Sequence, residues 1–274
     1  MDTLKMFPVK DDDEVYKINR DIPEPLQKPP FVYVYLGSRG VGKTNSLISE
    51  MLRKNMYGDI KGKPKVFQDI IVMSSTLGSD STSRHLIKKA TATYDTYDDS
   101  IVNDILEFQK SKDKKDRKHI LIIADDIAPM MGSRDNALFK LTSVHRHYLI
   151  SICYLIQQPR MIPPVVRNCA TAYHIYRCPN SSEQEKIFTD LSFMGDKKMV
   201  QKMYDYATNK PYQFLWVDCI KNSAWKWGAC DPEFLWEKYN ADGGYSPPFE
   251  LPSNKQDEID LEDDGIIGGC GRMI

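Results

Sequence analysis

The sequence lacks any long apolar run, and this absence excludes two classes of protein. No stretch of the chain approaches the roughly 20 apolar residues that a membrane-spanning helix needs. The N-terminal residues MDTLKMFPVKDDDE also lack the apolar centre of a secretory signal peptide. We therefore expect a soluble, intracellular protein that has no membrane partner.

Paired cysteines and a surplus of charge are absent as well. The six cysteines are scattered without a C-x-x-C pair, which is typical of buried free thiols in a reducing compartment. A formal net charge of −1 provides no global attraction to nucleic acid, so contact with DNA would need a local basic surface. The length of 274 residues suffices for one large α/β domain.

The most specific pattern in the sequence is a glycine-rich turn. Residues 31–44 read FVYVYLGSRGVGKT, a strand-forming run followed by the spacing G-x-x-x-x-G-K-[ST]. Backbone N–H groups freed by glycine wrap phosphate oxygens, the lysine reaches the β and γ phosphates, and the threonine hydroxyl ligates Mg²⁺. A helix that begins at Lys43 adds the positive end of its dipole. The motif predicts a nucleoside triphosphate site formed by Gly37, Ser38, Arg39, Gly40, Val41, Gly42, Lys43, Thr44 and Asn45.

Strand and helix patterns alternate along the middle of the chain, which predicts an α/β fold with a mostly parallel central sheet flanked by helices. A final hairpin pairs FLWV with AWKW. The predicted strands are 31–36, 69–74, 119–125, 150–156, 171–176 and 213–218, and the predicted helices are 43–56, 100–110, 136–144, 183–191 and 197–207. Outside this region, we interpret 1–30 as an N-terminal arm or linker, 31–231 as the folded domain, and 232–274 as an acidic, partly disordered tail.

A second phosphate-handling element is HILIIADD, a buried strand that ends in Asp125 and Asp126. Asp125 would hold the Mg²⁺ shell, while Asp126 would orient and deprotonate an attacking water. The alternative is a pair of helix-capping aspartates at a strand end. Between Lys43 and Asp125 lies the predicted strand 69–74, and an intervening strand of this kind separates the additional-strand ATPases from simple kinases and GTPases.

A third element is Gln157, which lies just past the apolar run 150–156. A polar amide at that position can report on the γ phosphate. An ordinary strand-terminal glutamine is the alternative, but Gln157 follows the next strand after Asp125 and Asp126, which favours the functional interpretation.

Three stretches together resemble one known family. GSRGVGKT, ILIIADD and, most specifically, HRHYLISICYLIQQPRMIPPVVRN are similar to the FtsK and HerA superfamily, in particular to the genome-packaging ATPases of poxviruses, other large DNA viruses, virophages and related elements. The resemblance covers about residues 31–180.

This resemblance implies a RecA-like P-loop NTPase domain of the additional-strand catalytic glutamate type. It implies ATP and Mg²⁺ as ligands and a homo-oligomeric ring, a pentamer or hexamer, that moves double-stranded DNA into a capsid. Capsid or portal proteins would be further partners, at a viral assembly site in the host cytoplasm or in the virion. The same resemblance implies that Lys43 and Thr44 bind the phosphates and Mg²⁺ and that Asp125 binds the metal. It also implies that Asp126 is the catalytic base, where a glutamate is usual, and that Gln157 is the sensor of the γ phosphate.

Ring ATPases of this kind complete each site with an arginine from the neighbouring subunit, because charge on the transferring phosphoryl group needs a fixed cation. Arg146 lies in the helix that leads into the sensor strand, eleven positions before Gln157, an offset that resembles that of the trans-acting arginine in FtsK-like motors. Arg167 is the second choice, and Arg160 lies in the same loop after the strand.

Two basic surfaces compete for contact with DNA. The run KSKDKKDRK at 110–118 has a local charge of +4, from six cations and two aspartates. Such a run is often only a solvated loop, since sequence-independent binding needs several phosphate contacts on one face. The second surface carries Lys197, Lys198, Lys202 and Lys210.

Three other functions compete with an ATPase. Asn254, Lys255 and Asp257 spell the N-K-x-D of GTPases, but they follow prolines in a polar tail, and the companion D-x-x-G is missing. A small-molecule kinase would not need a water-activating acid such as Asp126 beside the metal aspartate. A nucleotide-gated assembly scaffold would bind ATP and hydrolyse it slowly, independently of DNA.

Overall fold

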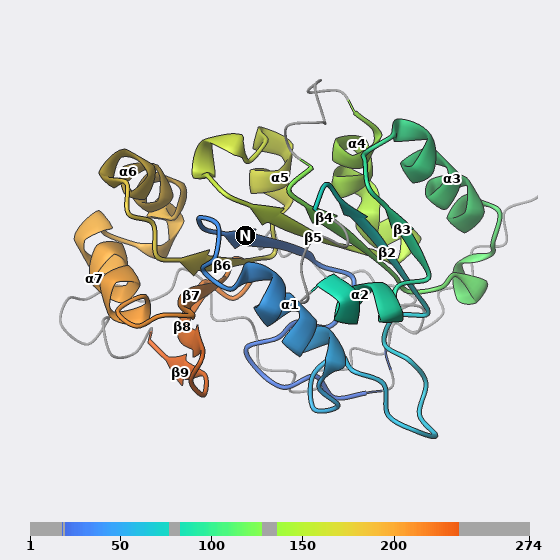
Figure 1. Ribbon diagram of the computed structural model, residues 1–274, viewed down its shortest axis with the longest axis horizontal. Helices are drawn as coiled ribbons and strands as arrows, with labels where there is room; N and C mark the ends of the chain where they lie inside the picture. The colour runs from blue at the N-terminus through green and yellow to red at the C-terminus, as the bar shows by residue number, and fades with distance from the viewer. Residues whose placement is uncertain (1–17, 19, 77–82, 128–135, 236–274) are drawn as a thin grey trace, which may run out of the picture. The chain divides into compact units, whose positions relative to one another are not determined.

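The computed structural model describes residue 18 and residues 20–76, 83–127 and 136–235. These residues form one sheet of nine strands in the order β3-β2-β4-β5-β1-β6-β7-β8-β9 (Figure 1). The strands from β3 to β6 run parallel, and β7, β8 and β9 are added antiparallel at one side. The strands are β1 (Val32–Leu36), β2 (Asp69–Ser74), β3 (Ala92–Tyr94), β4 (Ile120–Asp125), β5 (Ile150–Ile156), β6 (Ala172–Tyr176), β7 (Gln213–Asp218), β8 (Ser223–Gly228) and β9 (Glu233–Phe234).

Helices cover both faces of this sheet, with α1 and α2 on one face and α3, α4 and α5 on the other (Figure 1). The helices are α1 (Lys43–Leu52), α2 (Ser83–Lys89), α3 (Asp99–Lys110), α4 (Ala137–Val144), α5 (Pro164–Cys169), α6 (Ser181–Asp190) and α7 (Lys197–Ala207). The predicted α/β class with a mostly parallel sheet is therefore confirmed.

Strand β1 shows why both faces need a cover. Val32, Val34 and Leu36 pack in the core under α3 to α7, while Tyr33 and Tyr35 pack in the opposite core under α1 and α2. Every residue of β1 is buried. A strand buried on both faces belongs at the centre of a parallel sheet, because crossover helices lie on each side of it.

Several predicted elements differ from the observed ones at their ends. Helix α1 stops at Leu52, four residues before the predicted end at 56, because Arg53 turns to an extended conformation. The chain then folds back tightly on the helix end at Gly58, where a Cβ atom would lie 2.2 Å from the carbonyl oxygen of Leu52. The sequence patterns did not predict α2, β3, α5 or β9.

The strand that separates the two phosphate motifs is not the predicted one. In the sheet, β5 lies between β1 and β4, while β2, the predicted intervening strand at 69–74, lies on the outer side of β4. Order along the chain suggested β2, but order in the sheet depends on pairing between distant segments. The additional strand is thus the one that leads into Gln157.

The proposed boundaries at residues 30 and 231 stay predictions. Within the predicted arm, Leu26 is buried and the side-chain amide of Gln27 donates to the carbonyl oxygen of Thr171. Beyond the second boundary, β9 continues the sheet and Leu235 is fully buried. The N-K-x-D residues, Cys270 and the acidic tail at 257–264 lie outside the described residues.

Two expectations from composition can be compared with the described residues. Cys153 and Cys178 are buried free thiols as expected, whereas Cys169, Cys219 and Cys230 are partly exposed free thiols. In the described part of the chain, no helix combines the length and the apolar character that crossing a bilayer requires.

Candidate nucleotide site

The glycine-rich turn joins β1 to α1 and has a conformation that depends on glycine. Gly42 caps α1 with a φ of 103°, in the left-handed region. At Gly37 a Cβ atom would lie 2.7 Å from Cβ of Tyr176, so only glycine fits beside β6. The N–H group of Gly37 donates to the carbonyl oxygen of Ile156 at 3.1 Å, which attaches the turn to the end of β5. The predicted site residues of this segment are therefore contiguous around one turn, from Gly37 through Ser38, Arg39, Gly40, Val41 and Gly42 to Lys43, Thr44 and Asn45.

Lys43 is buried at the start of α1 and folds back over the turn. Its Nζ donates to the carbonyl oxygens of Gly37 at 2.7 Å and Ser38 at 3.1 Å. Burial lowers the pKa of Lys43, and the negative charges of Asp126 and Asp125 partly oppose this shift. Both carboxylates therefore lie near enough to act on the lysine.

Asp125 is buried at the carboxyl end of β4. Ser74, its register partner on β2, donates from Oγ to Oδ2 of Asp125 at 3.2 Å. Sequence analysis missed Ser74, although its place at the end of the strand 69–74 was a usable signal. Carboxyl ends of parallel strands meet at one edge of a sheet, which brings the two side chains together.

Asp126 has a φ of 52°, a left-handed conformation that is uncommon outside glycine and that recurs at functional sites. The side-chain amide of Gln157 donates to Oδ2 of Asp126 at 2.8 Å. The backbone N–H of Asp126 donates to Leu155 on β5, and Ser75 Oγ donates to the carbonyl oxygen of Asp126, both at 3.3 Å. These contacts hold the carboxylate beside the end of β5.

A buried polar cluster fixes the helix that follows the turn. Glu50 on α1 accepts hydrogen bonds from the Tyr35 hydroxyl at 2.6 Å and from Nε2 of His174, on β6, at 3.0 Å. Burial lowers the pKa of His174, with Glu50 acting in the opposite direction. The cluster ties the last turn of α1 to β1 and β6.

The two candidate arginines lie at the other edge of the sheet. Arg146 is exposed in the 3-10 helix η4 (His145–Tyr148), which follows α4 and leads into β5. Strand β5 separates Arg146 from Gln157; its seven residues, at about 3.3 Å each, place its ends about 20 Å apart. Arg146 therefore does not reach the site of its own chain.

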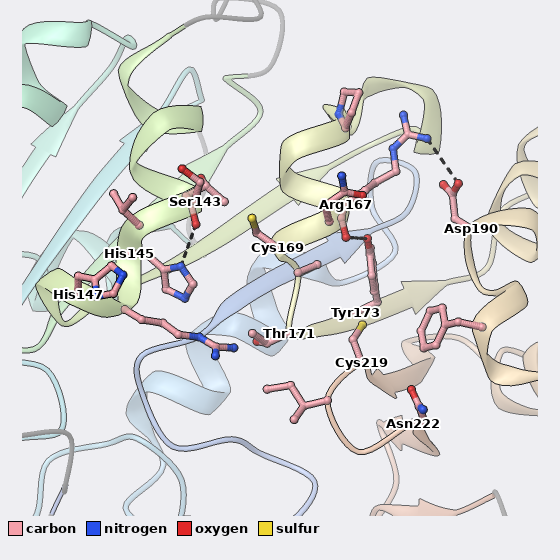
Figure 2. Close-up of a pocket in the computed structure, with 18 of the residues that line it drawn as sticks. Ser143, His145, His147, Arg167, Cys169, Thr171, Tyr173, Asp190, Cys219 and Asn222 are labelled. Carbon is pink, nitrogen blue, oxygen red and sulfur yellow. Dashed lines mark hydrogen bonds and ion pairs between the residues drawn. The ribbon is translucent and has the colours of Figure 1, made fainter. Parts of the chain in front are cut away.

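Arg167 lies on α5 and not in a loop as predicted. Its guanidinium is engaged within the chain: Nε and Nη2 donate to the carbonyl oxygen of Ile162, and Nη1 pairs with Asp190 at 3.4 Å (Figure 2). Arg167 and Arg146 both line a cavity of about 1160 Å³ at this edge. Arg160 is in the 3-10 helix η5 (Pro159–Met161) and pairs with Glu183 at 3.5 Å.

Comparison with known proteins identifies the family. The family of poxvirus A32 proteins matches residues 19–226. The chain belongs to this A32 family. This membership confirms the resemblance to viral packaging ATPases of the FtsK and HerA type that the three sequence stretches indicated.

Solved structures share the fold of this A32 family member. B204, the DNA-packaging ATPase from Sulfolobus turreted icosahedral virus, is 16% identical, with a TM-score of 0.52 over 72% of this chain and 97% of that chain. The genome packaging NTPase B204 from Sulfolobus turreted icosahedral virus 2, in complex with ATP-gammaS, is 15% identical, with a TM-score of 0.51 over 72% of this chain and 96% of that chain. No curated protein has a matching sequence.

Proposed function

We propose that this chain is the ATPase subunit of a motor that moves double-stranded DNA into a viral capsid. The observation that carries the proposal is the meeting of Lys43, Asp125, Asp126 and Gln157 at one edge of the sheet, next to a glycine-rich turn. The structural relatives B204, described as a DNA-packaging ATPase and as bound to ATP-gammaS, support the choice of ATP and DNA.

Each residue of the site has a role in this proposal. Lys43 exchanges the carbonyl oxygens of Gly37 and Ser38 for phosphate oxygens. Thr44 offers a hydroxyl and Asp125 a carboxylate, and Mg²⁺ prefers oxygen ligands of this kind. When bound, Mg²⁺ would neutralise part of the negative charge of the phosphates. Asp126 orients water and accepts its proton, and Gln157 holds the Asp126 carboxylate in position.

Arg146 completes the site of a neighbouring copy in this proposal. Because Arg146 lies before the amino end of β5, it cannot reach the nucleotide site of its own chain. A ring brings the far edge of one subunit to the nucleotide edge of the next, and a fixed cation there stabilises the charge of the transferring phosphoryl group. Arg167, which already pairs with Asp190, is the second choice.

For DNA contact we favour the loop at 110–118. Lys112, Lys114 and Lys115 are exposed and form no ion pair within the described ranges, whereas Lys118 pairs with Asp69 at 3.0 Å. On the competing surface, Lys197 of α7 pairs with Glu185. Symmetry in a ring would multiply the phosphate contacts of one loop.

The test of the proposed function is Lys43→Ala. We expect ATP turnover to fall to background while the far-UV circular dichroism spectrum stays that of the wild type, because Lys43 is the phosphate-binding cation. Phosphate release with and without duplex DNA measures the effect. Hydrolysis at the wild-type rate in this variant would contradict the nucleotide site, and phosphate transfer to a small acceptor in place of water would favour a kinase.

A further inference from the structure

Tyr212 has an unusual backbone conformation and a side chain open to solvent. It directly precedes β7, has a φ of 61°, and is 59% exposed. A bulky residue with positive φ is a genuine outlier that persists only when its surroundings impose it. Here the carbonyl oxygen of Tyr212 accepts a hydrogen bond from the N–H of Ala229 at 3.1 Å. Gly228 allows this approach, because a Cβ atom there would lie 2.3 Å from that oxygen.

The sheet topology places Tyr212 at the phosphate-binding edge. Strand β7 runs antiparallel to β6, with Phe214 opposite Tyr176, so β7 begins where β6 ends. The Tyr212 ring lies on the glycine-rich turn, since a Cβ atom at Gly42 would be 3.1 Å from its Cδ1. An exposed aromatic ring therefore adjoins Gly42, the residue that caps α1.

A cavity of about 400 Å³ opens beside this ring. Tyr212 and Gly42 line it together with Asn45, Ser46 and Ser49 along α1, and Cys230 and Asp231 line it beyond β8. The volume falls within the roughly 300–1,000 Å³ of small-molecule sites. Because Gly42 belongs both to this cavity and to the phosphate turn, the two spaces adjoin.

The order of the strands places the two carboxylates and Tyr212 on opposite sides of the phosphate turn, as the γ phosphate and the base lie at opposite ends of a nucleotide. Asp125 and Asp126 follow β4, and β5 and β1 come next, with the phosphate turn after β1. Tyr212 precedes β7, on the far side of β1 from those carboxylates. A triphosphate whose reacting end faces the carboxylates would direct its ribose and base toward Tyr212.

We propose that Tyr212 stacks on the purine base of the nucleoside triphosphate and that this cavity holds the base and ribose. Asn45, Ser49 and Asp231 supply hydrogen-bonding groups around it. Stacking uses the face of the ring, which explains why an aromatic side chain occupies an exposed and conformationally restricted position. The proposal rests on the proposed function, because the phosphates must bind at the neighbouring turn.

The test compares ligands with and without a base by isothermal titration calorimetry on the full chain. The ligands are ATP and inorganic tripolyphosphate, each with Mg²⁺, and the variants are Tyr212→Ala and Tyr212→Phe. We expect Tyr212→Ala to raise the Kd of ATP about tenfold, as loss of one stacked ring does, with the Kd of tripolyphosphate unchanged. Tyr212→Phe keeps the ring and should stay within about twofold of the wild type. Tyr94→Ala, at an exposed tyrosine on β3, is the matched control.

Three results would overturn the base site. Equal weakening of both ligands by Tyr212→Ala would mean that Tyr212 only supports the shape of the turn. An unchanged Kd of ATP in that variant would remove the stacking contact. A wild type that binds tripolyphosphate as tightly as ATP would refute the base site and leave the phosphate site intact, whereas a wild type that binds neither ligand would refute the proposed function itself.

Discussion

Gln157 donates a hydrogen bond from its side-chain amide to the carboxylate of Asp126 across 2.8 Å. The two residues come from different strand ends, Asp126 after β4 and Gln157 after β5, which pair in parallel with Asp125 opposite Leu155. The bond joins the position that would take a proton from water to the position that would sense the γ phosphate. In the proposed function, a change at the γ phosphate would therefore alter the orientation of the Asp126 carboxylate through this one contact.

This contact predicts coupled effects of Asp126 and Gln157 on hydrolysis. We expect Asp126→Asn to lower kcat by about 10²–10⁴ with ATP binding retained, because a general base is removed. Gln157→Leu should lower kcat less, and the double variant should be no slower than Asp126→Asn alone, since Gln157 acts through the carboxylate. Steady-state phosphate release in all four proteins measures the coupling. Strictly additive losses would show that the two residues act separately.

Placement of Arg146 at the far edge of the sheet predicts complementation between subunits. We expect Arg146→Ala to bind ATP normally but to lose about 10³-fold or more in turnover. Mixing it with Asp126→Ala should restore hydrolysis, because one interface then combines an intact arginine with an intact carboxylate.

Arg160→Ala is the matched control, because Arg160 is an exposed arginine that pairs with Glu183 in its own chain. It should retain wild-type turnover. A mixture of Arg146→Ala and Asp126→Ala that stays inactive would argue against a shared site, and the ATPase rate as a function of mixing ratio decides between these outcomes.

The basic loop predicts a selective loss of DNA stimulation. Replacing Lys112, Lys114 and Lys115 with alanine should leave the ATPase rate without DNA unchanged and reduce its stimulation by duplex. The slope of log Kd for DNA against log salt should become shallower by about 0.9 for each phosphate that the variant no longer neutralises. Lys198→Ala with Lys202→Ala, on α7, is the comparison on the competing surface. If that variant alone loses stimulation, α7 is the contact surface.

His145 predicts how stability depends on pH. Burial lowers the pKa of His145 from 6.5 to about 4, although Nδ1 is within 2.8 Å of the carbonyl oxygen of Thr142. Between pH 6.5 and 4 the unfolded chain therefore binds a proton that the folded chain does not. His145 therefore contributes fully to the free energy of unfolding above pH 6.5. As the pH falls from 6.5 to 4, up to about 3 kcal/mol of this free energy is lost.

Urea denaturation at pH 7.5 and 5.0 checks the sign. The wild type should lose stability at the lower pH, and His145→Gln should lose less of its own stability over the same interval. An equal loss in both proteins would show that other groups account for the pH dependence.

The glycine-rich turn, Asp125, Asp126 and Gln157 could be predicted because their signals are local. Consecutive backbone N–H groups bind phosphates in such motifs, so the motif from Gly37 to Thr44 can be recognised from contiguous residues. A parallel sheet then places the ends of β4 and β5 at one edge, whatever their exact order. Strands β2, β5 and β7 have their predicted bounds for a similar reason, since each is a compact run rich in apolar residues.

Only the tertiary structure decided the features that depend on pairing between distant segments of the chain. That β5 and not β2 separates β1 from β4 follows from hydrogen bonds between strands far apart in the chain. The same pairing carries Arg146 to the far edge and brings Tyr212 onto Gly42, although 170 positions separate those two residues in the sequence. No local pattern contains such contacts. The sequence alone therefore determined the glycine-rich turn and the two aspartates, while the order of the strands decided which side chains lie around them.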